Sequence, residues 1–118
     1  MRFTVDHEAS VSLYEQLRTQ IMEQVKSGAL IAGTKLPPVR ALATELGVAP
    51  YTVARVYRLL ERDGFLETHG RNGTVVSARE DTAESTLQLE ASAYAVRAIA
   101  LGVSPDAALE FVRRALGA

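Results

Sequence analysis

The chain has 118 residues, 13 basic and 14 acidic side chains for a formal net charge of −1, and no cysteine. A chain of this length accommodates one small domain with a short appendage, and the lack of cysteine excludes disulfides and thiolate metal sites. No apolar run approaches the ~20 residues that a membrane-spanning helix needs, and the N-terminus has no signal-peptide pattern, so we expect a cytoplasmic protein without a membrane partner.

The first firm element is a helix that begins after Ser12. Residues 1–11 alternate apolar positions and predict an extended arm. Ser12 and Glu15 have the spacing of a capping box, and Gly28 suits a left-handed helix stop. Apolar residues recur every fourth position and predict one buried stripe: Leu13, Leu17, Ile21 and Val25.

Two shorter helices follow a connector at residues 29–36 that has room for a short strand. Pro37-Pro38 precedes the first of them and Gly47 ends it. Pro50 begins the next helix, whose predicted buried face consists of Val53, Val56, Tyr57 and Leu60.

The opposite face of this third helix is basic. It carries Tyr51, Arg55, Arg58 and Arg62, which we call the basic ridge. Taken alone, the basic ridge is equally compatible with a solvated helix face and with a surface that binds a polyanion. The order of the elements favours the second interpretation.

A hairpin completes this order. Residues 65–68 and 74–77 are predicted strands, and residues 69–73 join them, with Asn72-Gly73 as a strong tight-turn signal. Arg71 at the tip can reach a DNA backbone or a narrow minor groove. A helix, a turn, a second helix and a wing together predict a winged helix-turn-helix DNA-binding domain at residues 1–80.

The remaining residues 81–118 form a predicted two-helix appendage, which we call the tail. One helix runs to about Leu101 and a second begins at Ser104-Pro105, where serine suits the cap and proline the first turn. Two short helices bury too little surface to fold alone. Their apolar side therefore needs either the same chain's first domain or, as we favour, a second copy in a symmetric homodimer. The predicted dimerisation residues are Leu87, Ala91, Tyr94, Ala98, Leu101, Leu109 and Val112.

Residues 12–78 resemble the DNA-binding domain of GntR-family transcription regulators. The similarity rests on the first helix, on the Leu-Pro-Pro-Val-Arg-Ala-Leu-Ala run from Leu36, and on the stretch from Val48 to Leu66. The tail, with Gly102-Val-Ser-Pro, resembles that of the YtrA subfamily, whose short helical region mediates dimerisation. The resemblance implies a homodimer on double-stranded DNA at a palindromic operator, with repression as the common mode. Together with the basic ridge, the resemblance predicts the following DNA-binding residues: Arg40, Tyr51, Thr52, Arg55, Arg58, His69, Gly70 and Arg71.

Some positions depart from the family pattern. Pro38 stands where many members have a hydroxyl residue that caps the helix, and Pro50 and Ala54 replace charged residues found in relatives. The base preference of a relative therefore cannot be transferred to this chain.

Other functions are less well supported. The net charge of −1 favours a second hypothesis, a winged helix used for protein contact without DNA. His7 and His69 have no partners typical of catalysis, and no phosphate-binding glycine motif occurs, so we expect neither an enzyme nor a cofactor or metal site. About 35 residues of tail cannot enclose a typical ligand pocket in one chain, which leaves a small effector only in a dimer cleft.

Overall fold

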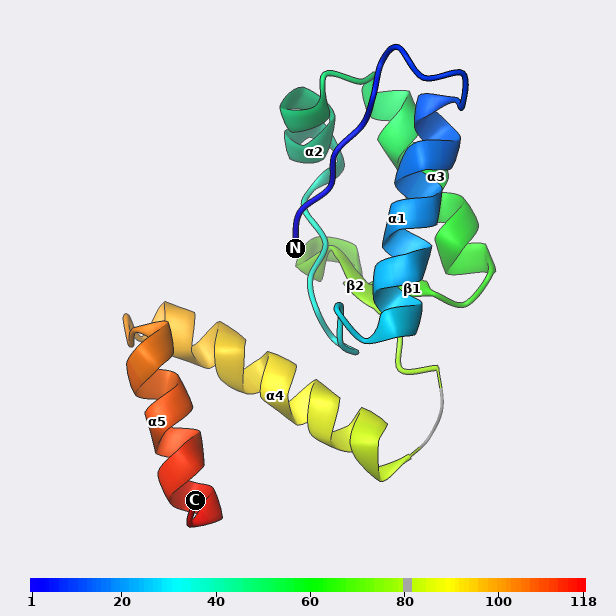
Figure 1. Cartoon of the computed structure of the whole chain (residues 1–118). Coiled ribbons are helices and arrows are strands. Elements are labelled where there is room, and N and C mark those ends of the chain that lie inside the picture. The colour runs from blue at the N-terminus through cyan, green and yellow to red at the C-terminus, as the bar shows by residue number, and fades with distance from the viewer. Residues whose placement is uncertain (80–81) are drawn as a thin grey trace.

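The computed structural model describes residues 1–79 and 82–118, apart from the side chain of Asn72. Its elements, shown in Figure 1, are α1 (Leu13–Ser27), α2 (Val39–Leu46), α3 (Pro50–Arg62), β1 (Leu66–Thr68), η1 (Gly70–Asn72), β2 (Thr74–Val76), α4 (Ala83–Ala100) and α5 (Pro105–Leu116). The predicted domain boundary between residues 80 and 81 lies outside the described residues. Within the described part, no helix is long and apolar enough to cross a bilayer.

Helices α1, α2 and α3 pack around one core to which β1 and β2 also contribute. The side chains of Leu17, Ile21, Val53, Val56 and Leu60 are almost completely removed from solvent. Ser12 caps α1 by accepting a hydrogen bond from the backbone of Glu15, and Gly28 ends it with φ 83°. The predicted apolar faces of these helices are therefore confirmed.

The arm at residues 1–11 lies antiparallel along α1, as Figure 1 shows. Its Phe3 side chain is 4% exposed and belongs to the core. His7 Nε2 lies 3.0 Å from the carbonyl oxygen of Leu46 at the end of α2. Three side chains spaced one helical turn apart bond the backbone of arm residues 2, 4 and 6, and these are Gln16, Gln20 and Gln24. The predicted arm is thus a fixed part of the domain.

The wing (residues 66–76) is an antiparallel pair in which Leu66 faces Val76 and Thr68 faces Thr74. The predicted hairpin and its joining residues 69–73 are confirmed, but Asn72-Gly73 does not form a tight turn of its own. Five residues separate the strands, a short 3₁₀ turn occupies Gly70–Asn72, and Gly70 and Gly73 carry positive φ values of 54° and 81°. Asn72-Gly73 therefore ends a five-residue loop instead of forming a two-residue turn.

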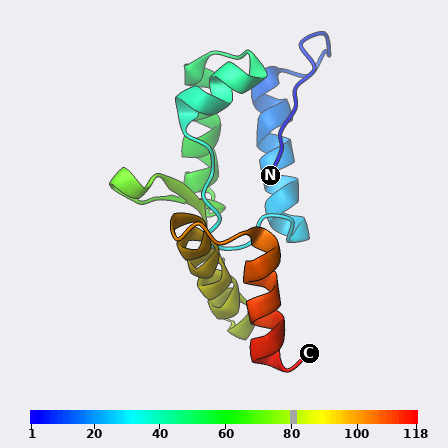
Figure 2. The same cartoon turned by 90° about the vertical axis from the view of Figure 1, so that its left-hand side faces the viewer.

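The connector pairs with the other edge of β2, with a bridge between Lys35 and Val75. The predicted short strand therefore exists as a brief extension of the wing. Figure 2 shows the wing projecting from the helices, with the tail on the other side of the connector.

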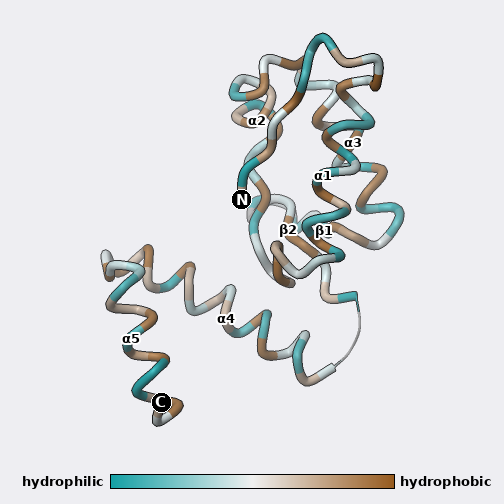
Figure 3. Tube along the Cα trace, viewed as in Figure 1, coloured by the Kyte–Doolittle hydropathy of each residue, from teal (hydrophilic) through white to brown (hydrophobic). Residues whose placement is uncertain are grey.

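Helices α4 and α5 form a V beneath the winged domain (Figure 1). Ser104 caps α5 and Pro105 occupies its first turn, as predicted. The Tyr94 hydroxyl donates to the Ala108 carbonyl oxygen at 2.8 Å, and Ala108 is buried between the two helices. Apolar side chains nevertheless remain exposed along both helices. Figure 3 shows hydrophobic positions recurring along the traces of α4 and α5.

Candidate nucleic-acid interface

The outer face of α3 is available to a ligand. Its first turn lacks a capping side chain, and Tyr51 in that turn is 68% exposed. Arg55 and Arg58 are exposed, whereas Thr52 is half-buried. The face opposite them is buried in the core, so α3 is held firmly while the basic ridge points to solvent.

Arg55 has a defined neighbour on α1. Its guanidinium carbon lies 4.3 Å from the centroid of the Tyr14 ring. A cation over an aromatic face is attracted by the negative π surface, and the contact restricts the arginine without neutralising its charge. Arg55 is therefore a preorganised cation at the N-terminal half of α3.

Arg62 differs from the rest of the basic ridge. Its Nε lies 3.4 Å from the Asp63 carboxylate. Among the described residues, no carboxylate forms an ion pair with Arg40, Arg55 or Arg58. The first three turns of α3 and the neighbouring helix α2 therefore present arginines whose charge no ion pair within the described residues neutralises.

Helix α2 presents Arg40 in its first turn, where no side chain caps the backbone amides. The predicted loss of a cap at Pro38 is thereby confirmed. Helix α2 is fixed to α3 by the Tyr57 hydroxyl, which donates to the Pro37 carbonyl oxygen at 2.7 Å. Burial raises the pKa of this phenol well above its ordinary value. This contact sets the position of Arg40 relative to the basic ridge.

The wing supplies the remaining predicted residues. Arg71 is exposed in the 3₁₀ turn, and Gly70 precedes it with the positive φ that this turn requires. His69 Nε2 lies 2.9 Å from the Glu67 carboxylate, while its backbone amide donates to the Gly73 carbonyl. His69 is thus held by contacts within the wing, and Arg71 next to it is exposed at the wing tip.

The predicted DNA-binding residues come from three neighbouring elements, because α2 packs on α3 and α3 packs on β1. Sequence reasoning missed Tyr14 and Glu67 as partners of two of them. The Tyr14–Arg55 contact joins two helices and had no local signal. Glu67 and His69 are two residues apart, which places their side chains on one face of an extended strand.

The predicted dimerisation residues fall into two groups. Tyr94 and Ala98 face α5 of the same chain, as the Tyr94 hydrogen bond and the half-buried Ala98 indicate. Tyr94 nevertheless keeps 40% of its surface exposed, and the other five predicted residues are exposed too: Leu87, Ala91, Leu101, Leu109 and Val112. The predicted set lacks five further exposed apolar residues of the tail, which are Leu89, Val96, Ile99, Phe111 and Leu116. The i, i+3 spacing of Val96 and Ile99 was the available signal.

Comparison with known proteins agrees with this geometry. The model of the gntR family of bacterial regulatory proteins matches residues 13–76. The HTH-type transcriptional regulator Rv1152 of Mycobacterium tuberculosis is 45% identical over 108 residues, which cover 92% of this chain and 88% of that protein. The HTH-type transcriptional repressor YtrA of Bacillus subtilis is 40% identical over 78 residues, covering 66% of this chain and 60% of the repressor.

A solved structure extends the likeness into the tail. YtrA from Sulfolobus acidocaldarius, a GntR-family transcription factor, matches with a TM-score of 0.60 and 31% identity. The match covers 96% of this chain and 95% of the solved one. The predicted fold class, mainly α with a two-stranded wing and two C-terminal helices, is confirmed.

Proposed function

The chain belongs to the GntR family of bacterial regulatory proteins and is a DNA-binding transcription regulator, not an enzyme, and we propose that it represses transcription as a homodimer on a palindromic operator. The observation that carries the proposal is the outer face of the first three turns of α3, where Tyr51, Arg55 and Arg58 face solvent opposite a buried face. A similar chain over nearly its whole length is a transcription factor, which supports the same conclusion.

We assign direct base contact to the start of α3. The N-terminal residues of a recognition helix are those that meet base edges in the major groove. Arg55 is restrained by Tyr14, and we expect it to contact a guanine with two hydrogen bonds, a contact worth roughly 1–3 kcal/mol of discrimination. Tyr51 and Thr52 precede it by one turn and line the same groove.

Phosphate contacts come from the residues around this centre. Arg40 and Arg58 are exposed cations on adjacent helices, and no carboxylate of the described residues pairs with either. Such contacts fix the register of the protein on DNA without specifying sequence. Arg71 at the wing tip extends the interface to the minor groove, and its neighbours His69 and Gly70 shape the tip.

The tail supports a homodimer. Within the described residues, thirteen large hydrophobic side chains are exposed, and ten of them belong to the tail. These ten are Leu87, Leu89, Tyr94, Val96, Ile99, Leu101, Leu109, Phe111, Val112 and Leu116. Exposed apolar surface of this density marks an interaction site. We therefore propose that residues 81–118 dimerise and that residues 1–80 bind DNA in the cytoplasm.

Repression follows from occupancy. A dimer that covers two half-sites one helical turn apart blocks a promoter by excluding the polymerase. The similar B. subtilis protein is a transcriptional repressor, which is consistent with this mode.

The experiment is a gel shift on the promoter region of the gene itself, at several salt concentrations. We expect a specific complex whose affinity falls as salt rises, and we expect Arg55→Ala to lose that specificity. The matched control is Arg62→Ala, which removes an arginine of the same helix that already pairs with Asp63. No binding at low salt, even to unrelated DNA, would overturn the proposed DNA interface and favour a protein-contact role.

A further inference from the structure

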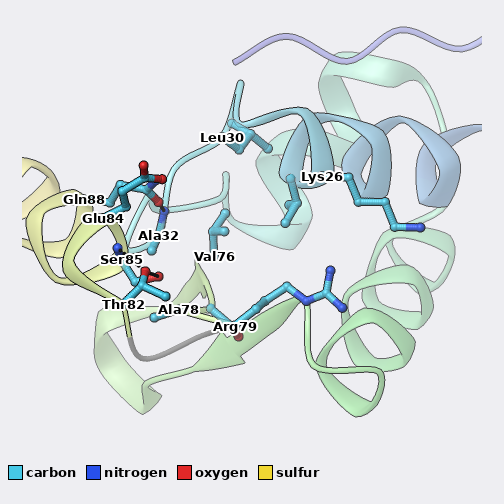
Figure 4. A pocket seen from close by; sticks show the side chains of 12 residues that line it. Lys26, Leu30, Ala32, Val76, Ala78, Arg79, Thr82, Glu84, Ser85 and Gln88 are labelled. Carbon is cyan, nitrogen blue, oxygen red and sulfur yellow. Dashed lines mark hydrogen bonds between the residues drawn. The ribbon is translucent and has the colours of Figure 1, made fainter.

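Two side chains of helix α4 hydrogen-bond the backbone N–H and C=O groups of a single connector residue, Ala32. The Gln88 side-chain oxygen accepts a hydrogen bond from the Ala32 amide at 3.1 Å. The Ser92 hydroxyl donates to the Ala32 carbonyl oxygen at 2.7 Å. Gln88 and Ser92 are one turn apart and therefore lie on the same face of α4. Figure 4 shows Gln88 beside Ala32 at the edge of the cleft between α4 and the winged domain.

The next residue, Gly33, permits this close approach. Its φ is 83°, and a Cβ added there would lie 3.0 Å from Ser92 Cβ and 3.2 Å from Leu89 Cδ2. A side chain at this position would therefore meet α4 as well as strain the backbone. The backbone of the connector at Gly33 therefore contacts side chains of α4 directly, and a side chain would not fit between them.

The connector residues that follow Ala32 hydrogen-bond to strand β2 of the wing. The Gly33 amide donates to the Val76 carbonyl at 2.8 Å, and the Val76 amide donates to the Thr34 carbonyl at 2.9 Å. Further along, the Leu36 amide donates to the Thr74 carbonyl at 2.8 Å. A continuous set of hydrogen bonds thus runs from α4 through the connector to β2.

We propose that Gln88 and Ser92 are positioning residues that fix the winged domain on α4 and so set the spacing of the two operator half-sites. This inference rests on the proposed homodimer. If the tails form the dimer core, the angle between α4 and the winged domain determines where each α3 lies. Half-sites must match the separation of the two recognition helices, so a fixed angle gives one preferred spacing.

The two residues act on the arrangement of domains and not on the bases. They lie outside α2, α3 and the wing tip, and neither is part of the predicted DNA surface. Loss of both hydrogen bonds would leave each winged domain intact on its own core. The expected consequence is a domain that rotates on its tail and that tolerates several half-site spacings.

The test is selection of binding sites from a random DNA pool, followed by sequencing. Wild type is compared with Gln88→Ala/Ser92→Ala and with a matched control, Thr86→Ala/Glu90→Ala, which changes two exposed polar residues one turn apart on the same helix. We expect all three proteins to select the same half-site. Wild type and control should enrich one spacing, and the Gln88/Ser92 variant should accept other spacings with a preference reduced roughly 10-fold, as two lost hydrogen bonds imply.

The outcomes separate this inference from the proposed function. If wild type selects no paired half-sites, the dimeric operator proposal fails. If wild type selects one spacing and the Gln88/Ser92 variant keeps it unchanged, the positioning role is wrong. A measurement without DNA gives an independent answer, because the cysteine-free chain accepts spin labels at Glu45→Cys and Thr86→Cys.

In that measurement, labelled chains are diluted with unlabelled ones so that only distances within one chain contribute. We expect one narrow distance between α2 and α4 in the wild-type background. The Gln88/Ser92 variant should lose this single distance and give a broad distribution. An equally narrow distribution in both proteins would show that other contacts fix the domain, and it would overturn the inference.

Discussion

The guanidinium of Arg55 stacks on the ring of Tyr14, 4.3 Å from its centroid, and this contact joins the DNA-facing side of α3 to the first turn of α1. The contact leaves Arg55 its hydrogen-bonding capacity, since its guanidinium makes no hydrogen bond or ion pair within the described residues. A side chain restrained before binding loses less entropy when it meets DNA. We therefore expect Tyr14 to contribute to DNA affinity without touching DNA.

Replacing Tyr14 by leucine should weaken specific DNA binding by roughly 2- to 5-fold, the value of an exposed cation–π contact of about 0.5–1 kcal/mol. Tyr14→Phe keeps the aromatic face and should bind like wild type. Fluorescence anisotropy with labelled operator DNA measures the affinities of both variants. Equal affinities for the leucine and phenylalanine variants would show that the stacking does not prepare Arg55.

Salt dependence distinguishes phosphate contacts from base contacts. Arg40→Ala and Arg58→Ala should each reduce the slope of log affinity against log salt by about 1, and should weaken specific and unrelated DNA alike. Arg62→Ala should change the slope less, because Arg62 already pairs with Asp63 at 3.4 Å. An unchanged slope in the Arg40 or Arg58 variant would remove that residue from the phosphate-contacting set.

The winged domain could be predicted because its signals are local. The spacing of Val53, Val56 and Leu60 defines the buried face of α3, and these three side chains are fully buried in the structure. Gly28 and Ser104 likewise mark helix ends through their own backbone or side-chain chemistry. In such cases the information needed lies within a few residues.

The contacts that orient the site could not be predicted in this way. Tyr14 and Arg55 are 41 positions apart, and Ser92 reaches Ala32 across 60 positions, so no periodicity connects them. The bridge between Lys35 and Val75 likewise joins segments 40 positions apart. Local patterns fix helices, whereas the packing of distant segments fixes the site.

Dimerisation through the tail can be tested with charged substitutions. Ile99 and Leu101 are 78% and 68% exposed near the end of α4. Ile99→Glu/Leu101→Glu should raise the dimer dissociation constant by roughly 100-fold or more, since burial of an unpaired carboxylate costs at least about 3 kcal/mol. Ultracentrifugation at graded concentrations measures this constant. Val11→Glu, an exposed apolar residue of the arm, should stay dimeric, and a dimeric double variant would place the interface elsewhere.

The arm should contribute strongly to folding because Phe3 is 4% exposed and packs in the core. Phe3→Ala should reduce the free energy of unfolding by about 3–5 kcal/mol, a large part of a total of about 5–15 kcal/mol. Val11→Ala, at an exposed position of the same arm, should stay within ~0.5 kcal/mol of wild type. Urea unfolding gives both values. Equal stability of the two variants would mean that the arm is not anchored by Phe3.

Tyr57 should make the free energy of unfolding depend on pH in the alkaline range. Burial raises the pKa of its phenol in the folded chain, whereas in the unfolded chain the phenol titrates near 10. The folded state therefore holds this proton more tightly, so the stabilisation is complete below pH 10 and is lost as pH rises from there toward the folded pKa. Tyr57→Phe should remove this pH dependence. Tyr57→Phe should also lower the free energy of unfolding by about 1 kcal/mol at neutral pH, since the Pro37 carbonyl loses its hydrogen-bond donor at 2.7 Å.

Tyr51→Phe, at a 68% exposed position, is the control and should keep the wild-type profile between pH 8 and 11. Denaturant unfolding across this range measures all three proteins, and a Tyr57→Phe profile parallel to wild type would assign the alkaline loss to other groups.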